Sequence, residues 1–179
     1  MRQRRQNCPV KKHVVKDYYT GAMMELLKKK PFSEITVSDL VKKSGASRAS
    51  FYRNYQSKEQ IVDEYLEQIF GTIIDQYPIS AENIREQVLN IFTEIYKWKS
   101  ELEILRKAGL LDQIDHLILR DTIGEIKNNQ VFHNKYQPYF FAGAASALIK
   151  AWIEFGFTEN PEEITAVFFQ SLSGYMEYQ

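Results

Sequence analysis

The stretch that decides the fold runs over residues 36–58 and reads TVSDLVKKSGASRASFYRNYQSK. Thr36 and Asp39 form a capping-box pattern, in which a hydroxyl and an acidic side chain three residues later begin a helix. Gly45 ends this short helix, because glycine accepts the left-handed backbone conformation that closes a helix end. Ser47 then caps a second short helix. Two short helices joined by a tight glycine turn predict a helix-turn-helix.

The second of these helices has two chemically different sides. Phe51 and Tyr55 fall at the spacing that turns one side of a helix toward a core. The other side carries hydrogen-bond donors suited to phosphates and base edges. Lys58 follows in the first turn of the next helix, where a cation opposes the helix dipole. A phosphate contact would explain the lysine at that position.

Helical patterns extend outward from this motif in both directions. Apolar residues recur at steps of four over residues 10–29, which predicts an amphipathic helix. A connecting helix is expected after the motif, and Tyr77-Pro78 marks its end because the residue before a proline is pushed out of helical geometry. Beyond it we expect further helices, with N-caps at Ser80 and Ser100 and a stop at Gly109. Pro138 and Asn160-Pro161 open the last two.

Composition and charge narrow the class of protein. The chain has 179 residues, 44% hydrophobic and 26% charged, which is typical of a soluble globular protein. Residues 1–60 hold 14 Lys+Arg against 5 Asp+Glu, whereas residues 61–179 hold 9 against 18. The basic end is therefore expected to face a polyanion. The absence of a secretory pattern and the single cysteine, Cys8, indicate a cytoplasmic protein without an internal disulfide.

The order of these residues along the chain resembles the TetR family of bacterial transcriptional regulators. The likeness covers about residues 10–66, and residues 72–179 share only the all-helical character and length of the family's second domain. The matching positions are Phe32, Thr36-Val37, Gly45, Ser47-Arg48-Ala49-Ser50-Phe51-Tyr52, Tyr55 and Ser57-Lys58-Glu59.

The resemblance implies an all-α fold, with an N-terminal three-helix helix-turn-helix DNA-binding domain and a C-terminal helical effector and dimerisation domain. The expected organisation is a flexible basic arm over 1–9, the helix-turn-helix domain over 10–56, a connecting helix over 57–77, and a helical ligand-binding and dimerisation domain over 78–179.

The resemblance also implies a set of DNA contacts. Tyr52 and Lys58 would bind phosphates, Thr36 and Ser38 would present hydroxyls, and the second motif helix would face the bases. The expected DNA-binding residues are Thr36, Ser38, Ser47, Arg48, Ala49, Ser50, Tyr52, Arg53, Asn54 and Lys58. A basic arm containing Arg2, Arg4, Arg5, Lys11 and Lys12 either adds minor-groove or backbone contacts or is a solvated tail.

The C-terminal half suggests two further sites. Small residues on the helix after Pro138 let another backbone approach, either in a second copy of the chain or within one subunit. The expected dimer interface comprises Ala142, Ala145, Ser146, Ile149, Phe168 and Leu172, with Val167 on the same stripe. Aromatic and apolar residues here either line a ligand pocket or are simply core. The expected pocket comprises Phe92, Tyr96, Leu102, Leu105, Leu117, Phe132, Tyr136 and Phe140.

Catalysis finds no support in the sequence. The three histidines lack metal-ligand spacing, and no phosphate-binding glycine loop or nucleophile elbow occurs. Asp112, Asp115 and His116 share a helical neighbourhood that fits either a metal site or an exposed polar face. We therefore expect no enzyme, cofactor or metal.

The expected function is that of a ligand-responsive repressor that binds a palindromic DNA operator as a homodimer, with activation also open. The alternative is a helical protein-interaction module or co-regulator, whose C-terminal domain binds a partner protein instead of a small molecule.

Overall fold

The computed structural model describes residues 9–80, 82–111, 114–128, 132 and 134–174. Within these ranges every regular element is helical, which confirms the all-α prediction. The elements are α1 (Pro9–Leu27), the 3₁₀ turn η1 (Phe32–Glu34), α2 (Val37–Ser44), α3 (Arg48–Asn54), α4 (Glu59–Gln76), α5 (Ile84–Lys97), α6 (Lys99–Lys107), α7 (Ile114–Asn128), α8 (Gln137–Glu154) and α9 (Pro161–Gly174).

The chain forms two compact units, Met1–Tyr65 and Leu66–Gln179. Their boundary falls inside α4, which is the helix predicted to connect two domains. No helix in the described part of the chain combines the length and hydrophobicity that a membrane span requires.

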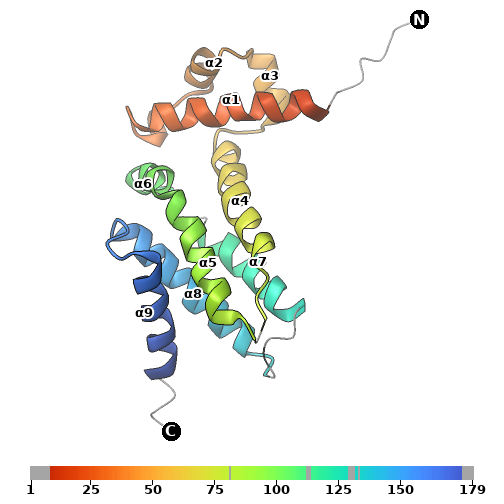
Figure 1. The fold of residues 1–179 in the computed structure, drawn as a ribbon. Helices are drawn as coiled ribbons and strands as arrows, with labels where there is room; N and C mark the ends of the chain where they lie inside the picture. The colour runs from red at the N-terminus through yellow and green to blue at the C-terminus, as the bar shows by residue number, and fades with distance from the viewer. Residues whose placement is uncertain (1–8, 81, 112–113, 129–131, 133, 175–179) are drawn as a thin grey trace, which may run out of the picture. The chain divides into compact units, whose positions relative to one another are not determined.

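In the first unit, α2 and α3 lie along one side of α1 (Figure 1). The side chains of Tyr19, Leu40 and Phe51 are completely buried between these helices. The Tyr19 ring meets Phe51 and Tyr55 edge to face, with centroids 5.5 and 5.8 Å apart. Such aromatic pairs stabilise a core beyond the effect of their buried area.

The helix ends of the motif confirm its predicted caps. Thr36 and Asp39 make both hydrogen bonds of a capping box at the start of α2. Gly45 ends this helix with φ 70°, a left-handed conformation that a side chain would strain. Ser47 begins α3, where its hydroxyl oxygen accepts the backbone N–H of Ser50 at 3.1 Å.

Two predicted caps in the second unit are wrong. The helix expected to begin at Ser80 begins at Ile84 instead. Ser80 donates its backbone N–H and its hydroxyl to the Asn83 side chain at 2.9 and 2.8 Å, so it closes a turn ahead of the helix. Ser100 lies inside α6, which follows Trp98 without a side-chain cap.

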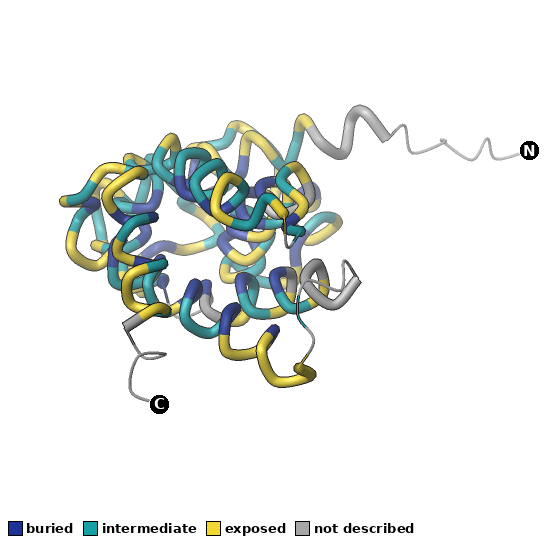
Figure 2. Tube along the Cα trace, turned by 60° about the horizontal axis from the view of Figure 1, so that its bottom comes forward, coloured by how far each residue is buried: buried dark blue, intermediate teal, exposed yellow. Residues whose placement is uncertain are grey.

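The second unit is built around α8, which packs against α6, α7 and α9, while α5 packs against α9 (Figure 1). Trp152 of α8 is buried, with its ring centroid 5.9 Å from Phe92 and 4.8 Å from Phe157. Its indole N–H donates to the Glu159 carbonyl at 3.0 Å. Along the helices, buried stretches alternate with exposed ones, as the tube in Figure 2 shows.

Most of the residues predicted for a dimer interface are buried inside a single chain. The structure buries Ala142, Ala145, Ser146, Ile149 and Phe168, and it leaves Leu172 partly exposed. The small side chains of Ala142, Ala145 and Ser146 permit a close helix approach, but the helix that packs most extensively on α8 is α7 of the same chain. Val167, expected on the inner stripe of the last helix, is exposed.

Candidate nucleic-acid interface

The position of α3 is set by α1 through Tyr19. Its hydroxyl donates to the backbone carbonyl of Ser47 at 3.0 Å, directly at the start of α3. Burial raises the pKa of the Tyr19 hydroxyl, so it remains a donor at neutral pH. Phe51 supplies the buried side of α3, and the opposite side is consequently turned to solvent.

The solvent side of the motif contains seven of the ten residues predicted to contact DNA. The exposed ones are Thr36, Ser38, Ser47, Arg48, Ala49, Tyr52 and Arg53. Arg48 and Tyr52 lie one turn apart on α3, Arg53 follows Tyr52 directly, and Tyr52 is 57% exposed. Two guanidinium groups and a phenol therefore project from one short helix, beside the hydroxyls at the start of α2.

The other three predicted contacts have a different environment. Ser50 is buried, at 9% exposure. Asn54 is half-buried, and its side-chain amide donates to the Ser50 carbonyl at 2.7 Å. Lys58 is also half-buried, and its ammonium group contacts backbone carbonyls of the turn before α2.

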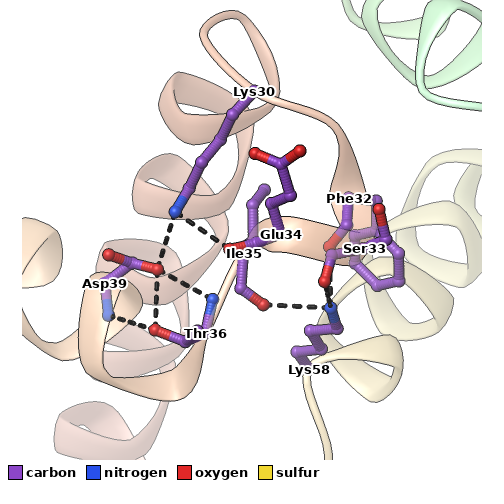
Figure 3. Close-up of polar contacts among 8 residues, drawn as sticks. All are labelled: Lys30, Phe32, Ser33, Glu34, Ile35, Thr36, Asp39 and Lys58. Atoms are coloured by element: carbon purple, nitrogen blue, oxygen red, sulfur yellow. Dashed lines mark hydrogen bonds and ion pairs between the residues drawn. The ribbon is translucent and has the colours of Figure 1, made fainter.

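The start of α2 is held by a compact polar network (Figure 3). One Asp39 carboxylate oxygen accepts the backbone N–H and the hydroxyl of Thr36 at 2.9 and 2.7 Å. The same oxygen accepts the Lys30 ammonium at 2.7 Å. Lys30 and then Thr36 hold the pKa of Asp39 well below its usual range, because each stabilises the ionised form.

We expect Asp39→Asn to lower the thermal unfolding midpoint at pH 7, because it leaves Lys30 without an anionic partner. A carboxyl whose pKa is lower in the folded protein stabilises the fold above its unfolded pKa, about 3.9, and loses that effect as the pH falls through the folded value. The difference in unfolding midpoint between Asp39→Asn and the wild type should therefore shrink as the pH is lowered from 5 toward 2. Thermal melts across this range measure it, and a difference independent of pH would contradict the assignment.

One basic pair on the motif was not among the predicted DNA contacts. Lys42 and Lys43 are exposed in the last turn of α2. Their position is favourable to the helix dipole, so the local pattern explained them without a ligand. Of the predicted basic arm, Arg2, Arg4 and Arg5 lie outside the described residues, as do the side chains of Lys11 and Lys12.

The second unit contains a small apolar cavity, with a void of about 30 Å³. Thr122 supplies its single hydroxyl, and no charged side chain is among its lining residues in the described chain. The lining comprises Phe70, Ile73, Ile79, Val88, Ile91, Phe92, Ile95, Ile118, Thr122, Phe141, Ala145 and Ile149.

This cavity is not formed by the residues predicted for a pocket. Of those eight, Phe92 alone lines the cavity described here. Tyr96 stacks on Trp152 at 5.7 Å, while Tyr136 and Phe140 are exposed at the start of α8. The remaining four are buried or partly exposed and do not line the cavity: Leu102, Leu105, Leu117 and Phe132.

The group of Asp112, Asp115 and His116, predicted as either a metal site or an exposed polar face, is only partly described. His116 is exposed on α7, whereas Asp112 and the Asp115 side chain lie outside the described residues.

Residues 21–65 match the sequence model of the family described as "Bacterial regulatory proteins, tetR family". This stretch includes α2, the glycine turn and α3, whose geometry is that of a helix-turn-helix. The N-terminal part of the chain is a TetR-family domain. The resemblance predicted from the motif is thereby confirmed.

Part of the chain is also similar to a curated protein. The uncharacterized HTH-type transcriptional regulator YxbF of Bacillus subtilis (strain 168) is 34% identical over 56 residues. That match covers 31% of this chain and 15% of YxbF, so the chain spans only a small part of that relative's length.

Solved structures share the fold of this chain over nearly its full length. Lin0861 from Listeria innocua superposes with a TM-score of 0.71 at 16% identity, covering 97% of both chains. A TetR transcriptional regulator from Streptococcus agalactiae 2603V has a TM-score of 0.63 at 17% identity, covering 90% of this chain and 95% of its own. The dihydroxyacetone kinase operon activator DhaS has a TM-score of 0.64 at 17% identity, with 93% and 98% covered. At these identities the likeness establishes the fold alone.

Proposed function

We propose that the protein regulates transcription by binding double-stranded DNA through α3 and the start of α2. The observation that supports this most is the exposed side of α3, where Arg48, Tyr52 and Arg53 project from a helix anchored by Tyr19 and Phe51 in a TetR-family domain. A helix of this kind fits the major groove, while its partner helix crosses the backbone.

The exposed side chains divide into two kinds of DNA contact. Arg48 and Arg53 each carry the donor pair that can bond both acceptors of a guanine edge, and the Ala49 methyl suits a thymine methyl. The Tyr52 phenol and the hydroxyls at the start of α2 suit phosphate oxygens, which fix orientation without reading sequence.

We expect Arg48→Ala to relax the preference at one base position, with a loss of about 1–3 kcal/mol on the preferred DNA. The matched control is Tyr52→Phe on the same helix. It removes one hydroxyl and should weaken binding to all DNA sequences by a similar factor. Binding of both variants to a set of DNAs that differ at single positions measures this. An equal loss of specificity in the two variants contradicts the division of roles.

A homodimer on a palindromic operator is part of this proposal. Two recognition helices about 34–36 Å apart can enter successive major grooves. A shallow surface groove on α8, lined in part by Gly143, Ala147 and Ala151 at steps of four, offers small side chains for a helix of a second copy. Ala147→Glu should then convert the dimer into a monomer in light scattering. A wild-type monomer at micromolar concentration contradicts the proposal.

The cavity of the second unit supports a neutral, apolar effector. It offers one hydroxyl, from Thr122, and no charge to pair with an ionised ligand among the lining residues described. Because its void is about 30 Å³, a larger effector requires the surrounding helices to move apart. Such a ligand shifts the protein between conformations only if it binds them with different affinity.

Thermal melts with neutral apolar compounds and with their carboxylate analogues test the effector. The neutral compounds should raise the unfolding midpoint, since a ligand that binds the folded state stabilises it. Stabilisation by the carboxylates alone contradicts this assignment, and stabilisation by neither group favours a partner protein as effector.

We propose repression by promoter blockage as the mode of regulation. In vitro transcription from a promoter that carries the selected DNA should fall when the protein is added and recover with effector. A rise in transcript on addition of the protein would identify an activator instead.

A further inference from the structure

Lys58, immediately before α4, directs its ammonium group at the backbone carbonyls of the turn that precedes α2 (Figure 3). Its Nζ donates to the backbone carbonyls of Phe32 and Ile35 at 2.7 and 2.9 Å, with a longer contact to the Ser33 carbonyl at 3.4 Å. The same atom lies 4.3 Å from the centre of the Phe32 ring. An ammonium group has three N–H donors, so these three carbonyls match its full donor capacity.

The remaining carbonyl of this turn is occupied by a second lysine. Lys30 donates to the Glu34 carbonyl at 3.0 Å and to the Asp39 carboxylate at 2.7 Å. Four successive carbonyls, those of residues 32–35, therefore accept from two ammonium groups. Thr36, the N-cap of α2, is the next residue along the chain.

We propose that Lys58 is a positioning residue for DNA binding and not a phosphate contact. It fastens the 32–35 turn to the start of α4 and thereby holds the N-terminus of α2, with the hydroxyls of Thr36 and Ser38, in place. A phosphate could take the ammonium only by breaking its bonds to the carbonyls. The positioning role rests on the proposed DNA binding. The hydrogen bonds from Lys58 to the 32–35 turn, which we call the Lys58 anchor, do not depend on it.

Salt dependence separates a positioning residue from a phosphate contact. Each phosphate neutralised by a protein cation contributes about 0.9 to the slope of log affinity against log salt concentration. Loss of a phosphate contact should lower the slope by about one, whereas loss of a positioning residue should lower the affinity and leave the slope unchanged.

The variants are Lys58→Met, which removes the donors, and Lys58→Arg, which keeps the charge. The surface control is Lys43→Met, since Lys43 is exposed on the neighbouring α2. Binding is measured to the DNA that the wild-type protein selects from a random duplex pool, or to the unselected pool if none is enriched.

We expect Lys58→Met to lower the affinity about tenfold at an unchanged salt slope and to lower the thermal unfolding midpoint by about 3 °C. Lys58→Arg should bind as weakly as Lys58→Met, because a planar guanidinium does not direct its donors to three carbonyls around one point. A salt slope lower by about one in Lys58→Met, with an unchanged midpoint and wild-type affinity in Lys58→Arg, would overturn the proposal.

A measurement without DNA tests the anchor independently. In NMR spectra of ¹⁵N-labelled lysine ammonium groups, the Lys58 group should give a slowly exchanging signal in the wild type. This signal should be absent in Lys58→Met. If that signal is protected but the wild-type protein binds no DNA, the anchor stands and the proposed function fails. If the Lys58 ammonium exchanges as fast as that of Lys43 and the midpoint is unchanged, the anchor is refuted.

Discussion

Replacing Phe51 with alanine should lower the free energy of unfolding of the N-terminal unit by about 3–5 kcal/mol and abolish DNA binding. Phe51 is completely buried, with its ring centroid 5.5 Å from Tyr19 and 5.8 Å from Tyr55. Truncation leaves a cavity among these rings, and the loss approaches the whole stability of a small domain. Because Phe51 supplies the buried side of α3, this helix would lose its support.

The control for this variant is the neighbouring residue on the same helix. Tyr52 is 57% exposed, although its ring meets Phe51 edge to face at 5.3 Å, so Tyr52→Ala should cost about 1 kcal/mol, much less than Phe51→Ala, while weakening DNA binding. Urea denaturation and DNA binding of the two variants give the comparison. If Phe51→Ala unfolds at the wild-type denaturant concentration, the aromatic core does not hold α3 as described.

A comparable loss is expected in the second unit from Trp152→Ala, which should cost about 3–5 kcal/mol. The Trp152 side chain is buried, and its ring lies 4.8 Å from Phe157 and 5.7 Å from Tyr96. It also packs 5.9 Å from Phe92, a residue that lines the apolar cavity. The variant should therefore both destabilise this unit and loosen one wall of the cavity.

Two further variants show how much of this loss comes from the ring packing of Trp152 and how much from its hydrogen bond. Trp152→Phe keeps much of the ring packing but loses the indole hydrogen bond to the Glu159 carbonyl, so its cost should be smaller, about 1–2 kcal/mol. Phe155→Ala removes a ring that is 72% exposed and should change stability by no more than about 0.5 kcal/mol. Denaturation curves rank the three, and an equal cost for Trp152→Ala and Phe155→Ala would contradict the described core.

The N-terminal motif was predictable because its signals are local. The capping box of Thr36, the left-handed Gly45 and the cap of Ser47 each act within four residues of themselves, and all three occur as expected. The capping box at the start of α9 is equally local, and Asn160 and Glu163 exchange two bonds of 2.9 Å there.

Features that depend on tertiary packing were not predictable in the same way. Lys58 looked free for a phosphate because its carbonyl partners lie 23–26 residues away in the sequence. The small residues of α8 permitted a close approach, but only the fold shows that the approaching helix is α7. The cavity lining comes from α4, α5, α7 and α8, so helical spacing within one segment could not identify it.

The central claim, sequence-specific DNA binding through α3, is tested most directly by selecting random double-stranded DNA with the purified protein at fixed, near-physiological salt. We expect enrichment of a palindrome that competes against bulk DNA, and loss of that enrichment at one base position with Arg48→Ala. An unenriched pool, with weak binding that disappears as salt rises, would contradict the claim and favour a helical module whose basic face binds an acidic protein.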